Sequence, residues 1–197
     1  MSTVPMPRSI ADRLRRLEHK QGYHAQNLPT GWNWSNQDPT ACVQTTNAYP
    51  FATDGREWIW KLTLTRQVRV NNLGILVVAA FSGMSHSVAG ILDKSRNVLA
   101  ISADSTTATY AANTIRSWAM GTPLTLQPGT YYAYLALAGT TKGNIVATAG
   151  SATALAAING GGGCGTLTTA PWTPPVLGAT IATIANSANV IPWTLLS

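Results

Sequence analysis

The stretch Gly83-Met84-Ser85-His86-Ser87 places two hydroxyls beside an imidazole in the sequence. A serine activated by a histidine is a common arrangement for nucleophilic catalysis of acyl transfer. The stretch lacks the second glycine of the GxSxG elbow, however, and adjacency in sequence does not place a hydroxyl and an imidazole in hydrogen-bond geometry. We therefore do not predict a serine hydrolase.

Carboxylates are the next candidates, because glycoside hydrolysis needs two of them about 5 to 9.5 Å apart across the substrate. Outside the N-terminal twenty residues the acids are Asp38, Asp54, Glu57, Asp93 and Asp104. Most of them adjoin turn residues such as Pro39, Gly55 and Lys94, which favours loop or capping roles. A hydrolytic pair stays open on sequence grounds, but we predict that the chain is not an enzyme.

Metal and phosphate sites have little support. Cys42, Cys164 and the three histidines do not follow any zinc-ligand spacing. The two cysteines could form at most one disulfide, and two separate thiols are the simpler interpretation. The glycines at 160–163 are not followed by Lys-Ser or Lys-Thr and open no helix, so they lack the features of a phosphate loop. We predict no metal and no other cofactor.

Aromatic residues in a polar setting form a more suggestive group. The C–H face of a sugar ring can rest on an exposed tryptophan while amides and carboxylates bind its hydroxyls. Trp32 and Trp34 lie one residue apart, with Asn33 and Asn36 beside them. We predict these four residues, together with Asp104, as ligand-binding candidates. The alternative is that the two tryptophans are anchors that hold their segment against the domain or a neighbouring subunit.

Alternating apolar residues dominate the rest of the chain and predict β-strands. Residues 58–65 place Trp58, Trp60, Leu62 and Leu64 on one face of a strand, which we predict to be half-buried. Further strands are predicted over 73–81, 88–92, 97–102, 114–120, 123–127 and 130–137, with a docked terminal strand near 190–196. No stretch between them is long enough for crossover helices. We predict a mainly β chain whose residues 53–197 form an antiparallel, jelly-roll-like β-sandwich.

The clearest helical signal covers Ser9 to Gln21. Ile10, Leu14 and Leu17 follow the 4,3 spacing of a coiled-coil seam, and Ser9 resembles a helix N-cap. The string from Arg13 to Glu18 matches the Arg-h-x-x-h-Glu pattern of three-stranded coiled coils, in which h is apolar. We predict that residues 1–21 form a trimeric coiled coil used for oligomerisation and attachment. The alternative is an amphipathic helix that lies on its own domain.

In the trimer, Arg13 would cover the seam with its alkyl stem and pair with Glu18 of a neighbouring helix. Residues 22–52 are rich in Asn, Gln, Thr, Pro and Trp without a helical or strand period. We predict that they form an extended neck or wrapping linker.

Charge and hydropathy exclude several classes of protein. The net charge is +6, but the first twenty residues carry five basic and two acidic side chains, so the remainder is close to neutral. A nucleic-acid binder would spread a basic stripe over a folded face, and we predict no nucleic-acid partner. Only 10% of the residues are charged. The longest apolar run, 75–81, is far shorter than the roughly 20 residues of a membrane span, so we predict no membrane insertion.

The helix, the Trp-containing neck and the Thr/Ala/Gly-rich β-domain, with its stretch Leu124-Thr-Leu-Gln-Pro-Gly-Thr-Tyr-Tyr132, together resemble a known class of protein. The chain is similar in style to the minor tail proteins and short fibres of tailed bacteriophages, especially those that infect actinobacteria. The resemblance implies a homotrimeric virion component, assembled in the host cytoplasm. Its N-terminal segment would bind other virion proteins, and its β-sandwich head would bind a host-surface glycan. It implies no catalytic residue.

Two other functions stay open. The chain could be a capsid decoration or head-fibre protein, in which case many copies would occupy capsid symmetry axes. It could also be a secreted carbohydrate-binding or hydrolytic domain, which would be a monomer acting without a particle.

Overall fold

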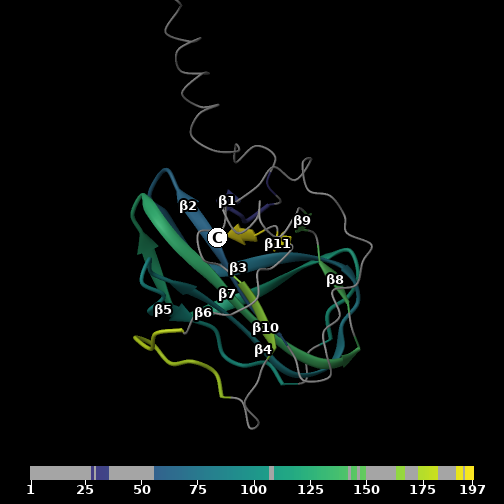
Figure 1. The fold of residues 1–197 in the computed structure, drawn as a ribbon. Coiled ribbons are helices and arrows are strands. Elements are labelled where there is room, and N and C mark those ends of the chain that lie inside the picture. The colour runs from purple at the N-terminus through teal and green to yellow at the C-terminus, as the bar shows by residue number, and fades with distance from the viewer. Residues whose placement is uncertain are drawn as a thin grey trace, which may run out of the picture.

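A computed structural model describes residues 28, 30–35, 56–106, 109–141, 143–145, 147–149, 163–166, 173–181, 190–192 and 194–197. Within these ranges the chain is built from β-strands joined by turns and loops, and it contains no helix (Figure 1). The predicted helix 9–21 and most of the predicted neck lie outside the described ranges. A mainly β, antiparallel chain is therefore confirmed.

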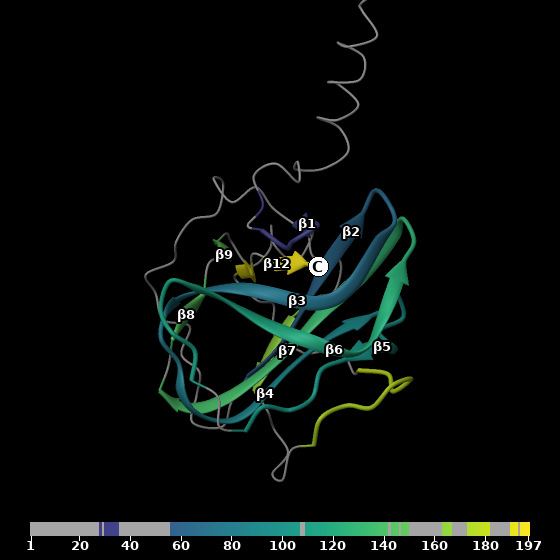
Figure 2. The same cartoon turned by 180° about the vertical axis from the view of Figure 1, so that it is seen from behind.

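The first sheet holds five strands in the order β1-β12-β3-β6, with β8 also paired to β3. All its pairings are antiparallel. Its strands are β1 (Trp34–Ser35), β3 (Val68–Ala79), β6 (Thr114–Leu126), β8 (Asn144–Ile145) and β12 (Thr194–Leu196). Figure 2 shows β3 and β6 side by side on the face turned away in Figure 1. The C-terminal strand thus lies inside the sheet, between β1 of the predicted neck and β3.

The second sheet has the order β10-β2-β7-β4-β5, again antiparallel throughout. Its strands are β2 (Arg56–Leu64), β4 (Ser82–Leu92), β5 (Val98–Ile101), β7 (Gly129–Thr141) and β10 (Gly163–Thr166). A separate two-stranded sheet pairs β9 (Ala147–Ala149) with β11 (Val190–Pro192).

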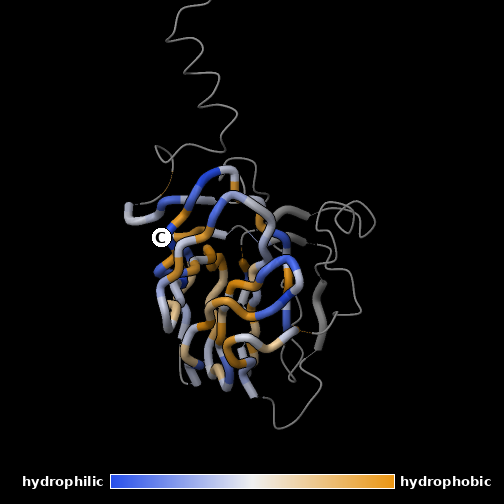
Figure 3. The backbone as a smooth tube through the Cα atoms, turned by 90° about the vertical axis from the view of Figure 1, so that its left-hand side faces the viewer, coloured by the Kyte–Doolittle hydropathy of each residue, from blue (hydrophilic) through white to orange (hydrophobic). Residues whose placement is uncertain are grey.

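The two large sheets share one hydrophobic cluster, which gives a sandwich-like arrangement. Strand β2 contributes the predicted face, Trp58, Trp60, Leu62 and Leu64, all of which are buried. Strands β3, β4, β6 and β7 contribute to the same cluster. The hydrophobic positions, orange in Figure 3, recur along the strands and gather in the middle of the body. Strand alternation therefore accounts for the core, as the sequence predicts.

The outer face of the second sheet is also apolar. Ile59 alternates with the core tryptophans of β2 and joins a second cluster with Val88, Leu92 and Tyr134. Part of its cover comes from 173–181, whose Ala179 and Ile181 pack against it. The same segment pairs with β5, because Gly178 N–H donates to Val98 O and Val98 N–H donates to Ala179 O, both at 2.9 Å. It therefore protects an edge strand as well as a face.

Strand β6 runs through a position where the sequence predicts a break between 114–120 and 123–127. The register of β3 against β6 shifts between Val70 and Asn72, so that Leu124 pairs with Val70 and Ala119 with Asn72. Pro123 falls in this irregularity, where no regular ladder hydrogen bond is lost. Asn71 and Asn72, which directly precede the predicted strand 73–81, lie within β3, and their N–H groups donate to Ser197 O. The bulge thus holds the end of β12.

Candidate functional site

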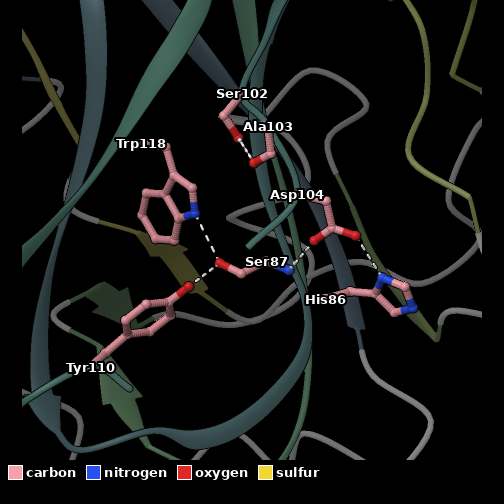
Figure 4. A network of polar contacts seen from close by, with 7 residues as sticks. All are labelled: His86, Ser87, Ser102, Ala103, Asp104, Tyr110 and Trp118. Carbon is pink, nitrogen blue, oxygen red and sulfur yellow. Dashed lines mark hydrogen bonds and ion pairs between the residues drawn. The ribbon is translucent and has the colours of Figure 1, made fainter. Parts of the chain in front are cut away.

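A group of polar side chains lies where β4 meets the loop that follows β5. His86 Nδ1 and Asp104 Oδ2 are 2.7 Å apart, with side chains that are 29% and 17% exposed. Asp104 Oδ1 accepts the backbone N–H of Ser87 at 2.8 Å. The carboxylate thus bridges an imidazole and a strand amide (Figure 4).

The path of the chain after β5 explains this position of Asp104. Ser102 leaves β5 to form a bridge with Met120 of the other sheet. Its Oγ accepts the N–H of Ala89 at 3.0 Å, and Asp104 then accepts the N–H of Ser87. These two side-chain oxygens accept hydrogen bonds from amides of β4, as the carbonyls of a neighbouring strand do elsewhere in the sheet. Asp104 therefore has a structural role, because it supplies a hydrogen-bond acceptor for a backbone amide at the edge of β4.

Ser87 faces the opposite way, into the core. It is fully buried, and its Oγ accepts Trp118 Nε1–H at 2.9 Å and the hydroxyl of Tyr110 (Figure 4). The rings of Tyr110 and Trp118 meet edge to face, with centroids 5.9 Å apart. The three residues come from β4, from the loop before β6 and from β6 itself, so this polar cluster joins the two sheets.

The group contains the Asp–His half of a catalytic triad but does not build a triad. Successive side chains of a strand point to opposite faces, so the imidazole of His86 lies on the loop side while the hydroxyl of Ser87 lies in the core. Ser87 Oγ, moreover, already accepts two buried donors. The stretch around Ser87 belongs to β4 and is not the sharp strand-to-helix turn of a nucleophile elbow.

Arg116 of β6 lies over the aromatic rings of this cluster. Its guanidinium carbon is 4.4 Å from the centroid of Tyr110 and 5.3 Å from that of Trp118. Nη2 donates to Ser105 Oγ over a long 3.4 Å, and Nε is buried without a hydrogen-bond partner among the described residues. Burial raises the pKa of Tyr110, although its hydrogen bond with Ser87 and the charge of Arg116 act in the opposite direction.

The predicted ligand-binding residues lie mainly against the first sheet. The ring of Trp32 lies over Gly74 of β3, and Trp34 is only 8% exposed and belongs to the main core. Asn33 is exposed; its N–H donates to Leu196 O and its carbonyl accepts Arg66 Nη2 at 2.6 Å. Both tryptophans thus hold the neck residues against the sheet, as the anchoring alternative describes.

The other predicted site residues are placed as follows. Asp104 lies far along the chain from the two tryptophans, in the cluster with His86. Asn36 and the oligomerisation residues Ile10, Arg13, Leu14, Leu17 and Glu18 lie outside the described ranges. Binding of a ligand by these residues, and trimerisation, stay predictions.

The turn that follows β4 is built around the carboxylate of Asp93. The carboxylate of Asp93 accepts the N–H of Ser95 at 2.7 Å, the N–H of Asn97 at 2.9 Å and Asn97 Nδ2–H at 2.8 Å. Slight burial raises the pKa of Asp93, but these hydrogen bonds outweigh it and hold the pKa below its usual value of 3.8. The loop is consequently built around an acid with a structural role.

The sequence does not single out Tyr110, Arg116 or Trp118, and it marks Ser87 only as part of the stretch 83–87. One signal was present: Arg116 alternates with Trp118 and Met120, two buried residues of β6, so a charged group falls in a row of inward positions. The partner residues are 31 and 23 positions from Ser87 in the chain, and the strand order that unites them cannot be deduced from periodicity.

The described ranges hold no group of three or more His, Cys, Asp or Glu placed to bind a metal ion. They likewise hold no helix long and apolar enough to cross a membrane. Comparison with protein-family models, with curated proteins and with solved structures finds no match to this chain.

Proposed function

We propose that this chain is a non-enzymatic structural protein of a phage particle, a trimeric tail-tip or fibre component whose β-domain binds a host-surface glycan. The observation that carries the proposal is that the side chains capable of catalysis are engaged in structural hydrogen bonds. Asp104 satisfies a strand amide, Ser87 accepts two buried donors, and neither is presented as a nucleophile or a general base toward an open surface. A rigid, two-sheet body with structural polar groups suits a particle component.

Recognition then falls to the loops between strands. Loops carry most binding residues in proteins whose sheets form a rigid scaffold. The turn at 93–97 and residues 102–106 of the loop after Ile101 are partly exposed. The turn is held by its own hydrogen bonds, and Asp104 is held by the Ser87 amide of β4. Such preformed loop residues lose little entropy on binding, which supports a recognition role for the loops that flank β4.

The finer architecture belongs to the same proposal. Residues 1–21 form a trimeric coiled coil that attaches to other virion proteins, 22–52 form the neck, and the sandwich has a jelly-roll-like strand order. Pairing of β1 with β12 supports a neck that is fastened to the β-domain at residues 34–35.

Two measurements test the function. Antibody or gold labelling of the chain in particles, viewed by electron microscopy, is expected to mark the tail tip. Labelling of capsid symmetry axes would favour the decoration alternative, and absence from particles would contradict both. Purified protein is also expected to adsorb to host cells while releasing no sugar from their polysaccharide. Release that disappears in Asp104→Asn or Glu57→Gln would overturn the non-enzymatic assignment.

A further inference from the structure

Arg116 differs from the other described arginines in how its guanidinium is held. Both flanking contacts are aromatic, with Tyr110 at 4.4 Å and Trp118 at 5.3 Å from the guanidinium carbon to the ring centroids. Because the two rings are tilted by 76° to each other, the guanidinium cannot lie flat on both, and the two contacts hold it against the aromatic pair. Its five N–H donors lie in the plane of the guanidinium.

These in-plane donors are poorly used by the described residues. The hydrogen bonds of Arg116 are the 3.4 Å contact of Nη2 with Ser105 Oγ and a contact with the Tyr110 side chain, and Nε finds no partner among the described residues. Asp104 is the nearby carboxylate, but its two oxygens accept from His86 and from the Ser87 amide. Within the described part of the chain no acid lies within ion-pair distance of Arg116.

The position of Arg116 is accessible from the surface. Arg116 and Ser105 are half-buried, and the neighbouring loop residues Ala103, Thr106 and Thr109 are exposed. The two other ionisable side chains of this loop region, His86 and Asp104, are paired with each other. The arginine is thus an oriented cation beside hydroxyl-bearing loop residues, a combination suited to an oxyanion.

We propose that Arg116 is an anion subsite that binds a carboxylate or phosphate group of an acidic cell-surface polysaccharide, with Ser105 assisting as a hydroxyl donor. This inference rests on the proposed glycan-binding function. A planar guanidinium held against aromatic rings favours two parallel N–H···O bonds to one oxyanion. Because a single charged contact is involved, salt weakens binding only modestly.

The test uses the full chain and three probes in calorimetry: an oligoglucuronate, an oligomer of glycerol phosphate and a neutral oligoglucose. Wild-type protein is expected to bind one or both acidic probes more tightly than the neutral one, and their ranking tells carboxylate from phosphate. Arg116→Gln is expected to weaken acidic binding by about tenfold, the equivalent of about 1.4 kcal/mol, and to leave neutral binding unchanged. Arg116→Lys keeps the charge without the planar fork and falls between.

Arg69→Gln is the matched control, since Arg69 is an exposed arginine of β3 in the same sheet. It is expected to bind all three probes like the wild type. Equal acidic binding by wild type and Arg116→Gln overturns the subsite, as does a wild type that shows no preference for acidic probes. Adsorption of Arg116→Gln to host cells distinguishes the anion subsite from the proposed glycan-binding function. If wild type and Arg116→Gln bind the acidic probes equally but the protein still adsorbs to cells, the subsite is wrong and the glycan-binding function is retained.

A second measurement avoids dependence on the variant's folding. Phenylglyoxal labelling of the wild-type protein, mapped by mass spectrometry, reports the reactivity of each arginine. The acidic probe is expected to protect Arg116 and not Arg69. Equal labelling of Arg116 with and without the probe overturns the inference.

Discussion

Ser87 is one of the residues through which the two sheets make polar contacts, as Trp60 does when its Nε1–H donates to Thr194 Oγ1 at 2.8 Å. The Ser87 hydroxyl is buried and accepts one donor from Tyr110 and one from Trp118, and both partners belong to the other side of the core. A buried donor without a partner costs far more than a satisfied pair contributes. Only one relative placement of β4 and β6 satisfies both donors, so the cluster helps to fix how the sheets align.

Replacing Ser87 with Ala tests this role. The change orphans two buried donors, and we expect the free energy of unfolding to fall by about 1 to 3 kcal/mol for each. Urea denaturation followed by far-UV circular dichroism measures the loss. Ser85→Ala is the control, because Ser85 is exposed on the same strand, and its change should stay within about 0.5 kcal/mol. Similar losses in the two variants would contradict the assignment.

Two buried tyrosines predict a loss of stability at alkaline pH. Burial raises the pKa of Tyr110, and burial followed by the nearby Glu57 carboxylate raises that of Tyr134, whose hydroxyl donates to Glu57 Oε1 at 2.6 Å. The native state therefore holds protons that the unfolded state releases near pH 10. Stability is fully present below about pH 10 and falls as pH rises toward the native pKa values.

Melting temperatures between pH 8 and 11 measure this effect. In Tyr134→Phe we expect a shallower fall than in the wild type, because one of the two proton-linked groups is gone. A fall of identical steepness in the two proteins would show that Tyr134 does not contribute.

Among the individual residues of the polar cluster, the sequence predicted one, Asp104, as a site residue. His86 was noted beside two serines. The pairing of His86 with Asp104 depends on Ser102 leaving β5 for the other sheet, which no local pattern encodes. Arg116 was missed because an arginine in an alternating strand is usually assigned to the solvent face.

Among the elements, the contact between Trp32 and β3 joins the neck to the first sheet. A Cβ added at Gly74 would lie 2.3 Å from Cη2 of Trp32, so only glycine lets the ring rest on the strand. Trp32 packs there beside Leu76 and Leu195. The neck residues are thus part of the sheet's outer cover.

A double-mutant cycle tests this packing. Gly74→Ala should push the ring off β3 and destabilise the protein by about 1 to 3 kcal/mol. In a Trp32→Ala background the same change should cost much less, which gives a coupling of at least about 0.5 kcal/mol. Chemical denaturation of the four proteins supplies the values, and additive effects would rule out the contact.

Strand positions were more predictable than strand limits. The alternation of Trp58 to Leu64 identified the core face of β2 because side chains in strands repeat every two residues. The same reasoning broke β6 between 120 and 123 and began β3 at 73 and not at Val68, since it could not foresee that the bulge pairs with Ser197. Local patterns report burial, whereas bulges depend on residues distant in sequence.

On the scale of the whole molecule, few charged side chains are available for electrostatic self-association, because only 10% of the residues are charged. The described body has apolar clusters on the inner and outer faces of the second sheet, each largely covered by the chain itself. The source of assembly that the sequence predicts is the helix 9–21, which lies outside the described ranges. An isolated helix of this length is marginal in water, whereas three helices around one axis bury the seam residues.

We therefore predict a homotrimer that depends on Leu14. Burying Ile10, Leu14 and Leu17 contributes about 1.5 to 3 kcal/mol for each side chain before ordering costs. Light scattering at micromolar concentration is expected to give three times the chain mass of 20.8 kDa. In Leu14→Asp, three carboxylates would meet in the seam, and we expect a monomer with an unchanged β-sheet spectrum. Arg16→Asp introduces the same side chain at an outward heptad position and should stay trimeric. A monomeric wild type, or a trimeric Leu14→Asp, would refute the role of this helix.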